Sequence, residues 1–160
     1  MGEIVALEQL VKNIQELKAC HKTIVTTNGC FDILHVGHVR YLKSSKALGD
    51  VLVVCLNSDN SVKRLKGSGR PLNTQDDRAE VLAALESVDY VVIFDEDTPV
   101  NHLANIKPDI HTKGGDYDIN SLPEAKVIME NGGRVEFISF VEGKSTTKII
   151  EKSCNNIVGA

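Results

Sequence analysis

The chain has 160 residues, of which 42% are hydrophobic and 25% are charged. This length and balance indicate one globular domain with a real core, and they argue against two domains, wholesale disorder or a collagen-like chain. Lys and Arg total 18 against 22 Asp and Glu, and the net charge of -4 gives no general attraction to nucleic acid or anionic membranes. Any phosphate-binding surface must therefore be local.

Apolar residues at helical spacing predict a first helix over residues 4–20. Short runs rich in β-branched residues then alternate with longer amphipathic segments, which predicts strands and helices in turn. In chain order the predicted strands span 23–27, 51–56, 90–94, 109–112 and 134–140. The predicted helices span 36–48, 74–86, 99–105, 122–130 and 145–151. This alternation predicts an α/β fold in three Rossmann-like layers, with a five-stranded parallel sheet flanked by helices.

Two stretches depart from the regular pattern. Residues 63–77, here called the basic segment, are the most polar stretch, and we expect them to be the most mobile. His111 and Thr112 occupy strand positions where apolar residues are usual, so we expect that strand to be loose or partly exposed there.

Nothing in the sequence suggests a membrane span, a signal peptide or a metal cage. No apolar run approaches the roughly 20 residues of a membrane helix, and residues 1–8 lack the layout of a signal peptide, so we expect a cytoplasmic protein. The cysteines are scattered without the close pairs of a zinc site, so we expect reduced thiols. They are Cys20, Cys30, Cys55 and Cys154.

The strongest chemical signal lies where the strand at 23–27 turns into the next helix, in Asn28-Gly-Cys-Phe-Asp-Ile-Leu-His-Val-Gly-His38. Ligands of parallel sheets bind beyond the carboxyl ends of the strands. His35 and His38 lie near one face of a helix start, whose free N–H groups and dipole favour an anion. Gly37 lets a phosphate approach the backbone closely. The histidines could instead only cap the helix or bind a metal, but the glycine-bearing turn favours a triphosphate site.

Three further loops carry candidate ligand contacts. Four cations lie within eight residues of the basic segment and could fold over a triphosphate, although such runs are usually solvated surface: Lys63, Arg64, Lys66 and Arg70. Arg78 could order that segment, contact phosphate or form a surface salt bridge. The hydroxyls of residues 145–147 open a helix as a cap or an anion site. Gly114 and Gly115 allow close backbone approach beside Asp116, which could accept from a sugar hydroxyl or cap the turn.

These blocks, read together, resemble the adenylyltransferase domain of bacterial ADP-heptose synthases, within the His-x-Gly-His nucleotidyltransferase superfamily. The resemblance covers residues 23 to 152 and rests on blocks in the same order: 28–38, 57–59, 64–67, 69–71, 77–86, 94–99, 113–117 and 145–147. It implies a nucleotidyltransferase domain over 23–153, preceded by a helical extension over 1–22 and followed by a tail over 154–160.

The resemblance implies that a sugar 1-phosphate attacks the α-phosphorus of ATP and expels pyrophosphate, giving ADP-heptose for the lipopolysaccharide inner core. It implies catalytic roles for His35, His38 and Lys66. It implies nucleotide contacts from Asn28, Gly29, Cys30, Phe31, Gly37, Lys63, Arg64, Arg70, Arg78, Lys113, Gly114, Ser145, Thr146 and Thr147. It implies sugar-phosphate contacts from Asp32, Asn57 and Asp116, although Asp32 could equally support its loop.

The implied partners are ATP and heptose 1-phosphate, with Mg²⁺ carried by the ATP phosphates and no dedicated metal site. We expect no nucleic acid or membrane partner, a separate kinase that supplies the sugar phosphate, and a homodimer, since relatives commonly dimerise. One rival is a cytidylyltransferase acting on glycerol 3-phosphate or another polyol phosphate. Another is a nucleotide-binding module without chemistry. An NAD-type binder fits worst, because the first turn lacks Gly-x-Gly-x-x-Gly.

Overall fold

The computed structural model describes residues 1–115, 117–139 and 144–158. Its six parallel strands form one sheet in the order β1-β4-β3-β2-β5-β6. The strands are β1 (Glu3–Ile4), β2 (Ile24–Gly29), β3 (Val51–Asn57), β4 (Tyr90–Phe94), β5 (Ile110–Gly114) and β6 (Arg134–Ile138). The helices are α1 (Leu7–Ala19), α2 (Val36–Lys46), α3 (Asp59–Lys66), α4 (Gln75–Ala83), α5 (Val100–Ile106), α6 (Pro123–Glu130) and α7 (Thr146–Val158), with a 3-10 turn at Ile119–Ser121.

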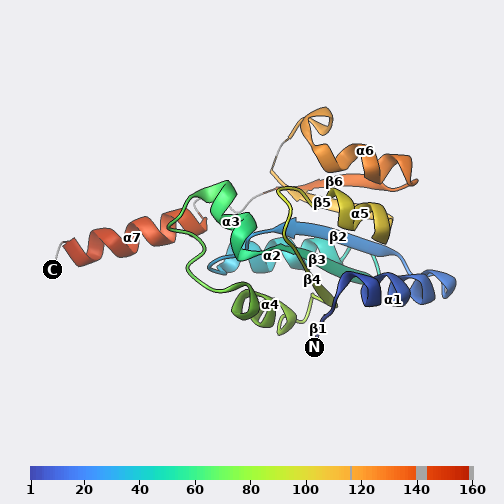
Figure 1. Ribbon diagram of the computed structural model, residues 1–160, viewed down its shortest axis with the longest axis horizontal. Coiled ribbons are helices and arrows are strands. Elements are labelled where there is room, and N and C mark those ends of the chain that lie inside the picture. The colour runs from blue at the N-terminus through green and yellow to red at the C-terminus, as the bar shows by residue number, and fades with distance from the viewer. Residues whose placement is uncertain (116, 140–143, 159–160) are drawn as a thin grey trace.

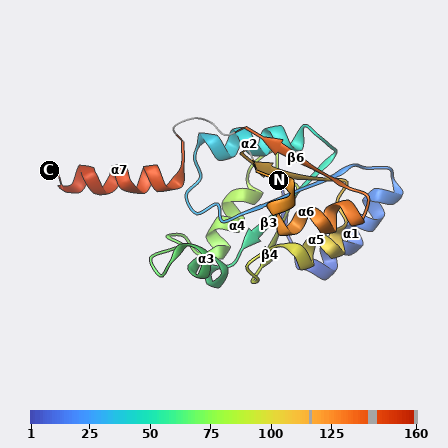
Figure 2. The same cartoon turned by 90° about the horizontal axis from the view of Figure 1, so that it is seen from above.

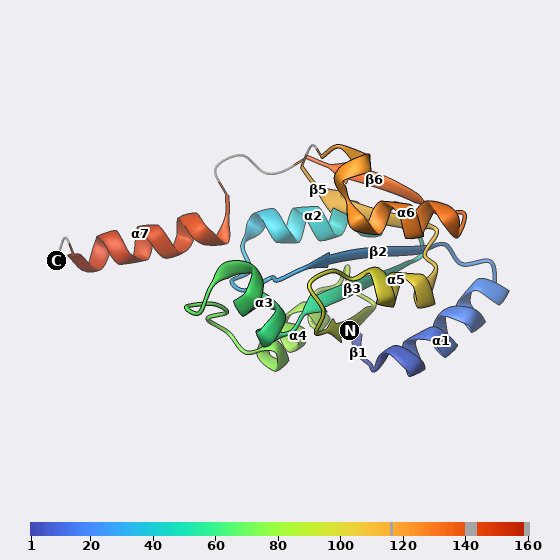
Figure 3. The same ribbon diagram turned by 45° about the horizontal axis from the view of Figure 1, so that its top comes forward.

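The sheet is the middle layer of three, as Figures 1 and 3 show. Helices α2 and α4 cover one face, where they bury Leu42 and Leu82 against the side chains of β2 and β3. Helices α1, α5 and α6 cover the other face, where Leu10 and Ile128 join a second core cluster with the side chains of β3 and β4. All seven residues of β3 are buried, as expected of a central strand in a sheet covered on both faces. The predicted α/β architecture is confirmed.

The sheet has six strands, so the prediction of five was wrong. The additional strand, β1, has two residues, which pair in register with Tyr90 and Val91 of β4. A strand of two residues is too short to show alternating apolar and polar positions, so the predicted helix began inside it, at Ile4. Residues 1–22 therefore contribute both an edge strand and the buried Leu10 of α1 to the domain.

The other predicted strands and the helices before residue 140 lie within three residues of their observed ends. The basic segment departs from the prediction, which placed no helix there, because its first residues form the last turn of α3. The last helix is longer than predicted and runs to Val158, through most of the predicted tail. Figure 2 shows α7 projecting away from the body of the domain. In the part of the chain that the structure describes, no helix is long and apolar enough to cross a membrane.

His111 and Thr112 are fully buried, so the expected loosening of β5 was wrong. His111 Nδ1 lies 2.8 Å from Thr26 Oγ1, and Thr112 Oγ1 lies 2.8 Å from Ser45 Oγ. Polar strand residues are tolerated inside because hydroxyl and amide groups from β2 and α2 satisfy them.

Candidate active site

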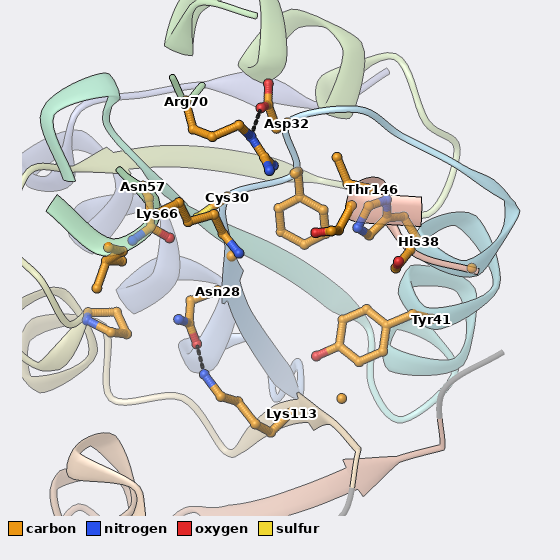
Figure 4. Close-up of a pocket in the computed structure, with 18 of the residues that line it drawn as sticks. Asn28, Cys30, Asp32, His38, Tyr41, Asn57, Lys66, Arg70, Lys113 and Thr146 are labelled. Carbon is orange, nitrogen blue, oxygen red and sulfur yellow. Dashed lines mark hydrogen bonds and ion pairs between the residues drawn. The ribbon is translucent and has the colours of Figure 1, made fainter. Parts of the chain in front are cut away.

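A cleft of about 660 Å³ opens at the carboxyl ends of β2, β3 and β5. Strand order reverses there, because β3 and β4 follow β2 on one side while β5 and β6 lie on the other. Figure 4 shows the side chains that converge on this cleft from the β2–α2 turn, α3, β5 and the start of α7. Such a switch point is where parallel α/β sheets bind ligands.

The two histidines of the β2–α2 turn are held by the backbone of the helix that they begin. His35 Nδ1 accepts a hydrogen bond from the Gly37 N–H at 3.1 Å, and His38 Nδ1 accepts from the His35 N–H at 3.3 Å. A neutral ring that accepts at Nδ1 carries its proton at Nε2. No described residue hydrogen-bonds to either Nε2, so both N–H groups are available to a ligand. The capping alternative and the ligand-binding role are therefore compatible.

Both rings are neutral near pH 7. Burial lowers the pKa of His38 to about 4, with a smaller contribution from His35, whose ring centroid lies 3.9 Å away. Burial and then the charge of Lys144 lower the pKa of His35. A bound polyphosphate would oppose these effects, since negative charge favours the imidazolium.

Gly37 is required by the packing of the turn. A Cβ on this residue would lie 2.8 Å from Cε1 and 2.9 Å from Nδ1 of His35, so any other side chain would displace the capping ring. Gly29 has a similar constraint, because its Cβ would meet the Phe31 ring at 2.9 Å. Asn28, Gly29, Cys30, Phe31 and Gly37 all line the cleft, as predicted contacts should.

Asp32 anchors the far end of the basic segment. Its carboxylate accepts from Arg70 Nε at 2.7 Å and from the backbone N–H groups of Leu72 and Asn73 at 2.9 and 3.0 Å. Burial raises its pKa, but these hydrogen bonds and the Arg70 charge outweigh burial and lower it. The structure thus shows the loop-supporting role of Asp32, and its contact with sugar stays a prediction.

The four predicted cations of the basic segment separate into two pairs. Lys66 and Arg70 line the cleft. Arg64 donates to Asp97 at 2.7 Å and to the Asp95 carbonyl, and neither it nor Lys63 is among the cleft residues. Helix α3 separates Arg64 from Lys66, because residues two apart on a helix face different directions, while Arg70 lies beyond the end of that helix.

Arg78 lies beneath the cleft and is 2% exposed. It donates to the carbonyls of Asn73, Cys30 and Asn57 at 3.1, 2.6 and 2.9 Å, and to Asp59 at 2.8 Å. All three guanidinium nitrogens thus have protein partners. Arg78 therefore orders the loops by bonding to several of them at once, and it does not line the cleft. Its burial excludes a surface salt bridge.

The β5 side of the cleft carries a buried polar chain. Lys113 Nζ lies 3.2 Å from Asn28 Oδ1 and 2.9 Å from Glu124 Oε1. His111 Nε2 lies 3.2 Å from the same Asn28 oxygen, and burial lowers the pKa of His111 to about 4. Gly114 and Asn57 also line the cleft, while the predicted Asp116 lies outside the described residues.

The start of α7 closes the remaining side. Ser145, Thr146 and Thr147 line the cleft. Thr146 Oγ1 donates to the Ile33 carbonyl at 2.9 Å, and Ser145 Oγ accepts from the Lys148 N–H at 3.1 Å, so Ser145 does act as a cap. The Thr146 bond fastens α7 to the β2–α2 turn.

Sequence reasoning missed several cleft residues with polar side chains, among them Tyr41, Glu124 and Lys144. Tyr41 follows His35 and His38 at a spacing of three, so the helical face could have revealed it. Lys144 directly precedes the three hydroxyl residues 145–147, which the sequence had already indicated as a possible anion site. Glu124 offered no signal beyond an acidic residue in the first turn of a helix, which is common.

Within residues 1–115, 117–139 and 144–158, no three His, Cys, Asp or Glu side chains gather as metal ligands would. The cleft instead offers donors: imidazole N–H groups, ammonium groups and two helix N-termini. Such a set suits a polyanion that arrives with its own cation.

Comparison with known proteins gives concordant matches. Residues 26–152 match the model of the cytidylyltransferase-like family. The bifunctional protein HldE of Geobacter sulfurreducens is 53% identical over 146 residues, which are 91% of this chain and 30% of that protein. The HldE of Pseudomonas fluorescens is 50% identical over 153 residues, which are 96% of this chain and 32% of that protein. The chain therefore spans about a third of the length of the curated relatives that it matches.

A solved structure shares the fold. The crystal structure of the lipopolysaccharide core biosynthesis protein from Thermoplasma volcanium is 31% identical, with a TM-score of 0.61. The match covers 77% of this chain and 99% of that one.

Proposed function

Because the chain belongs to the cytidylyltransferase-like family of nucleotidyltransferases, we propose that it transfers AMP from ATP to D-glycero-β-D-manno-heptose 1-phosphate. The products are ADP-heptose and pyrophosphate, for synthesis of the lipopolysaccharide inner core. The observation that carries the proposal is the pair of imidazoles that line a cleft, each fixed at Nδ1 by a backbone N–H at a helix N-terminus. The ordered sequence blocks and the HldE relatives support the choice of heptose phosphate.

In the reaction, an oxygen of the sugar phosphate forms a bond to the α-phosphorus of ATP. The bond from that phosphorus to the oxygen bridging to the β-phosphate breaks, and its electron pair leaves with pyrophosphate. No covalent enzyme intermediate is needed, so catalysis rests on positioning and on stabilising phosphate charge. His35 and His38 donate from Nε2 to phosphate oxygens, and the free N–H groups at the start of α2 add to this field.

The remaining groups bind and orient the substrates. Lys66 and Lys113 approach the phosphates from opposite sides of the cleft, and the start of α7 supplies Ser145 and Thr147. Asn57 lines the cleft and is assigned to the sugar, and the sugar contact expected of Asp116 stays a prediction. Mg²⁺ enters with ATP, held by phosphates and water, and offsets part of the charge on the leaving pyrophosphate.

Pyrophosphate release tests the proposal against its main rival. ATP and CTP are each paired with heptose 1-phosphate and with glycerol 3-phosphate. We expect turnover with ATP and heptose 1-phosphate. Turnover confined to CTP and glycerol 3-phosphate would establish the cytidylyltransferase instead, and nucleotide binding without release from any pair would establish a binding module.

The expected kinase step, homodimer and cytoplasmic location complete the proposal. A sugar 1-phosphate acceptor requires a preceding kinase reaction, which we assign to another domain or polypeptide. The four cysteines are free thiols, in keeping with a reducing compartment. On α7, Ile149 and Ile157 are exposed, which supports a second copy as the covering partner. Light scattering decides whether the protein in solution has twice the mass of the chain.

A further inference from the structure

Lys113 and Glu124 form an ion pair that sequence patterns did not connect. Lys113 stands near the end of β5, and Glu124 is the second residue of α6. The Nζ–Oε1 distance is 2.9 Å, and both residues line the cleft. The Glu124 side chain is 3% exposed and that of Lys113 is 22% exposed, so the carboxylate is enclosed while the ammonium still reaches the cleft.

A buried carboxylate is costly unless something compensates its charge. Burial raises the pKa of Glu124, but the ammonium of Lys113, together with the backbone N–H of Glu124, outweighs burial and holds that pKa below its usual range. Glu124 is therefore ionised near neutral pH. The contact is an ion pair more than an aligned hydrogen bond, and no described donor otherwise reaches Oε1. The main partner of this carboxylate is the ammonium of Lys113.

The ammonium is also held from a second side. Asn28 Oδ1 lies 3.2 Å from Lys113 Nζ, as the dashed line in Figure 4 shows. His111 Nε2 lies 3.2 Å from the same Asn28 oxygen, and Thr26 Oγ1 holds the other side of that ring at 2.8 Å from His111 Nδ1. A lysine side chain has four rotatable bonds and seldom keeps one position without such constraints. Two polar groups of the protein thus hold the ammonium, one by a hydrogen bond and one by charge, and N–H donors remain for a ligand.

Resting on the proposed function, we propose that Glu124 is a positioning residue that holds the Lys113 ammonium against the reacting phosphates. Asn28 lies at the end of β2, just before the turn that leads to His35 and His38, so an ammonium fixed beside it lies on the β5 side of the expected phosphate position. Glu124 makes no contact with substrate and acts through Lys113. Lys113 meets oxygens of the two phosphates that become joined.

A double-mutant cycle tests this relation. We expect Glu124→Gln to lower kcat about tenfold with KM for ATP changed less than about twofold, and Lys113→Met to lower kcat about 100-fold. In the Lys113→Met background, Glu124→Gln should have no further effect, because its partner is gone. A second tenfold loss in that background overturns the proposal, since Glu124 would then act independently of Lys113.

Glu130→Gln is the matched control, because this residue lies on the same helix with its side chain 62% exposed. It should leave kcat and the unfolding temperature unchanged. If Glu124→Gln does not fold, Glu124→Asp retains the charge and should keep more activity than Lys113→Met. Activity of Glu124→Asp at or below that of Lys113→Met overturns the proposal.

A readout without turnover separates this inference from the proposed function. Lys113 is labelled with an amine-acylating reagent, and the modified fraction is measured by mass spectrometry. We expect Glu124→Gln to increase the labelling rate at least about threefold, because the ammonium loses its buried partner. Unchanged labelling overturns the positioning role, whereas lack of turnover by the unmodified chain overturns only the proposed reaction.

Discussion

The two walls of the cleft hold their polar groups in different ways. On the wall formed by the β2–α2 turn, backbone N–H groups fix His35 and His38, and burial keeps both rings neutral. On the wall formed by the basic segment, a carboxylate holds Arg70 at 2.7 Å. One wall therefore offers oriented neutral donors, while the other offers positive charge that is partly paired before any ligand binds.

This difference shows that positive charge counted along a sequence overstates what a ligand can meet. Arg64 and Arg78 both pair with carboxylates, at 2.7 and 2.8 Å. Lys66 lines the cleft and forms no ion pair with a described residue. Of the cations predicted in the basic segment, Lys66 is the one best placed to meet substrate. The wall formed by the β2–α2 turn, here called the histidine wall, should therefore dominate catalysis.

The largest effect should come from His35→Asn. Asparagine caps helices well, so the start of α2 is kept while the imidazole N–H is lost. We expect kcat to fall by about 100-fold or more, as when one oriented donor to transition-state charge is removed. The free energy of unfolding should change by less than about 1 kcal/mol. Steady-state kinetics and urea unfolding measure the two quantities.

Lys43→Asn is the control for that prediction, because Lys43 lies exposed on the same helix. It should leave kcat within about twofold of the unmodified chain. If His35→Asn retains full turnover, the histidine wall has no catalytic role. A fall in kcat that comes with a large fall in the free energy of unfolding would instead assign His35 to folding.

The same two walls explain what the sequence could predict. The turn at 28–38 was predictable because its glycines, its histidines and the helix start lie within eleven residues and depend on local geometry. Arg78 was not, because its partners come from three separate segments. His111 was misjudged for a related reason, since a polar strand residue looks exposed until the hydroxyl of Thr26 is brought beside it. No local sequence pattern marks Glu124, because its contact with Lys113 forms only when α6 packs beside β5.

The second prediction concerns the buried floor between the walls. His111 has a pKa of about 4 in the folded protein and about 6.5 when unfolded, so between these values only the unfolded chain binds the proton. Stability is therefore full above pH 6.5 and is lost as the pH falls toward 4. From pH 7 to pH 5 this residue should remove about 2 kcal/mol from the free energy of unfolding. Urea unfolding at the two pH values measures the loss.

His111→Gln should reduce that pH-dependent loss, whatever its effect on stability at pH 7. His21→Gln is the matched control, because His21 is exposed, and it should leave the loss unchanged. Identical pH dependence of the unmodified chain and His111→Gln would show that His111 does not stay neutral in the folded protein.

The smallest effect separates two cations that stand two residues apart on α3. Lys66→Ala should lower kcat/KM for ATP about tenfold, because an ammonium in the cleft is removed from the polyphosphate. Arg64→Ala should lower it less than about twofold, because its guanidinium is paired with Asp97 and does not line the cleft. The Lys66 effect should also shrink in 0.5 M salt, where the Debye length falls to about 4 Å. Equal losses in the two variants would mean that the whole basic segment contributes a diffuse field, and that the division seen on this wall has no bearing on ATP.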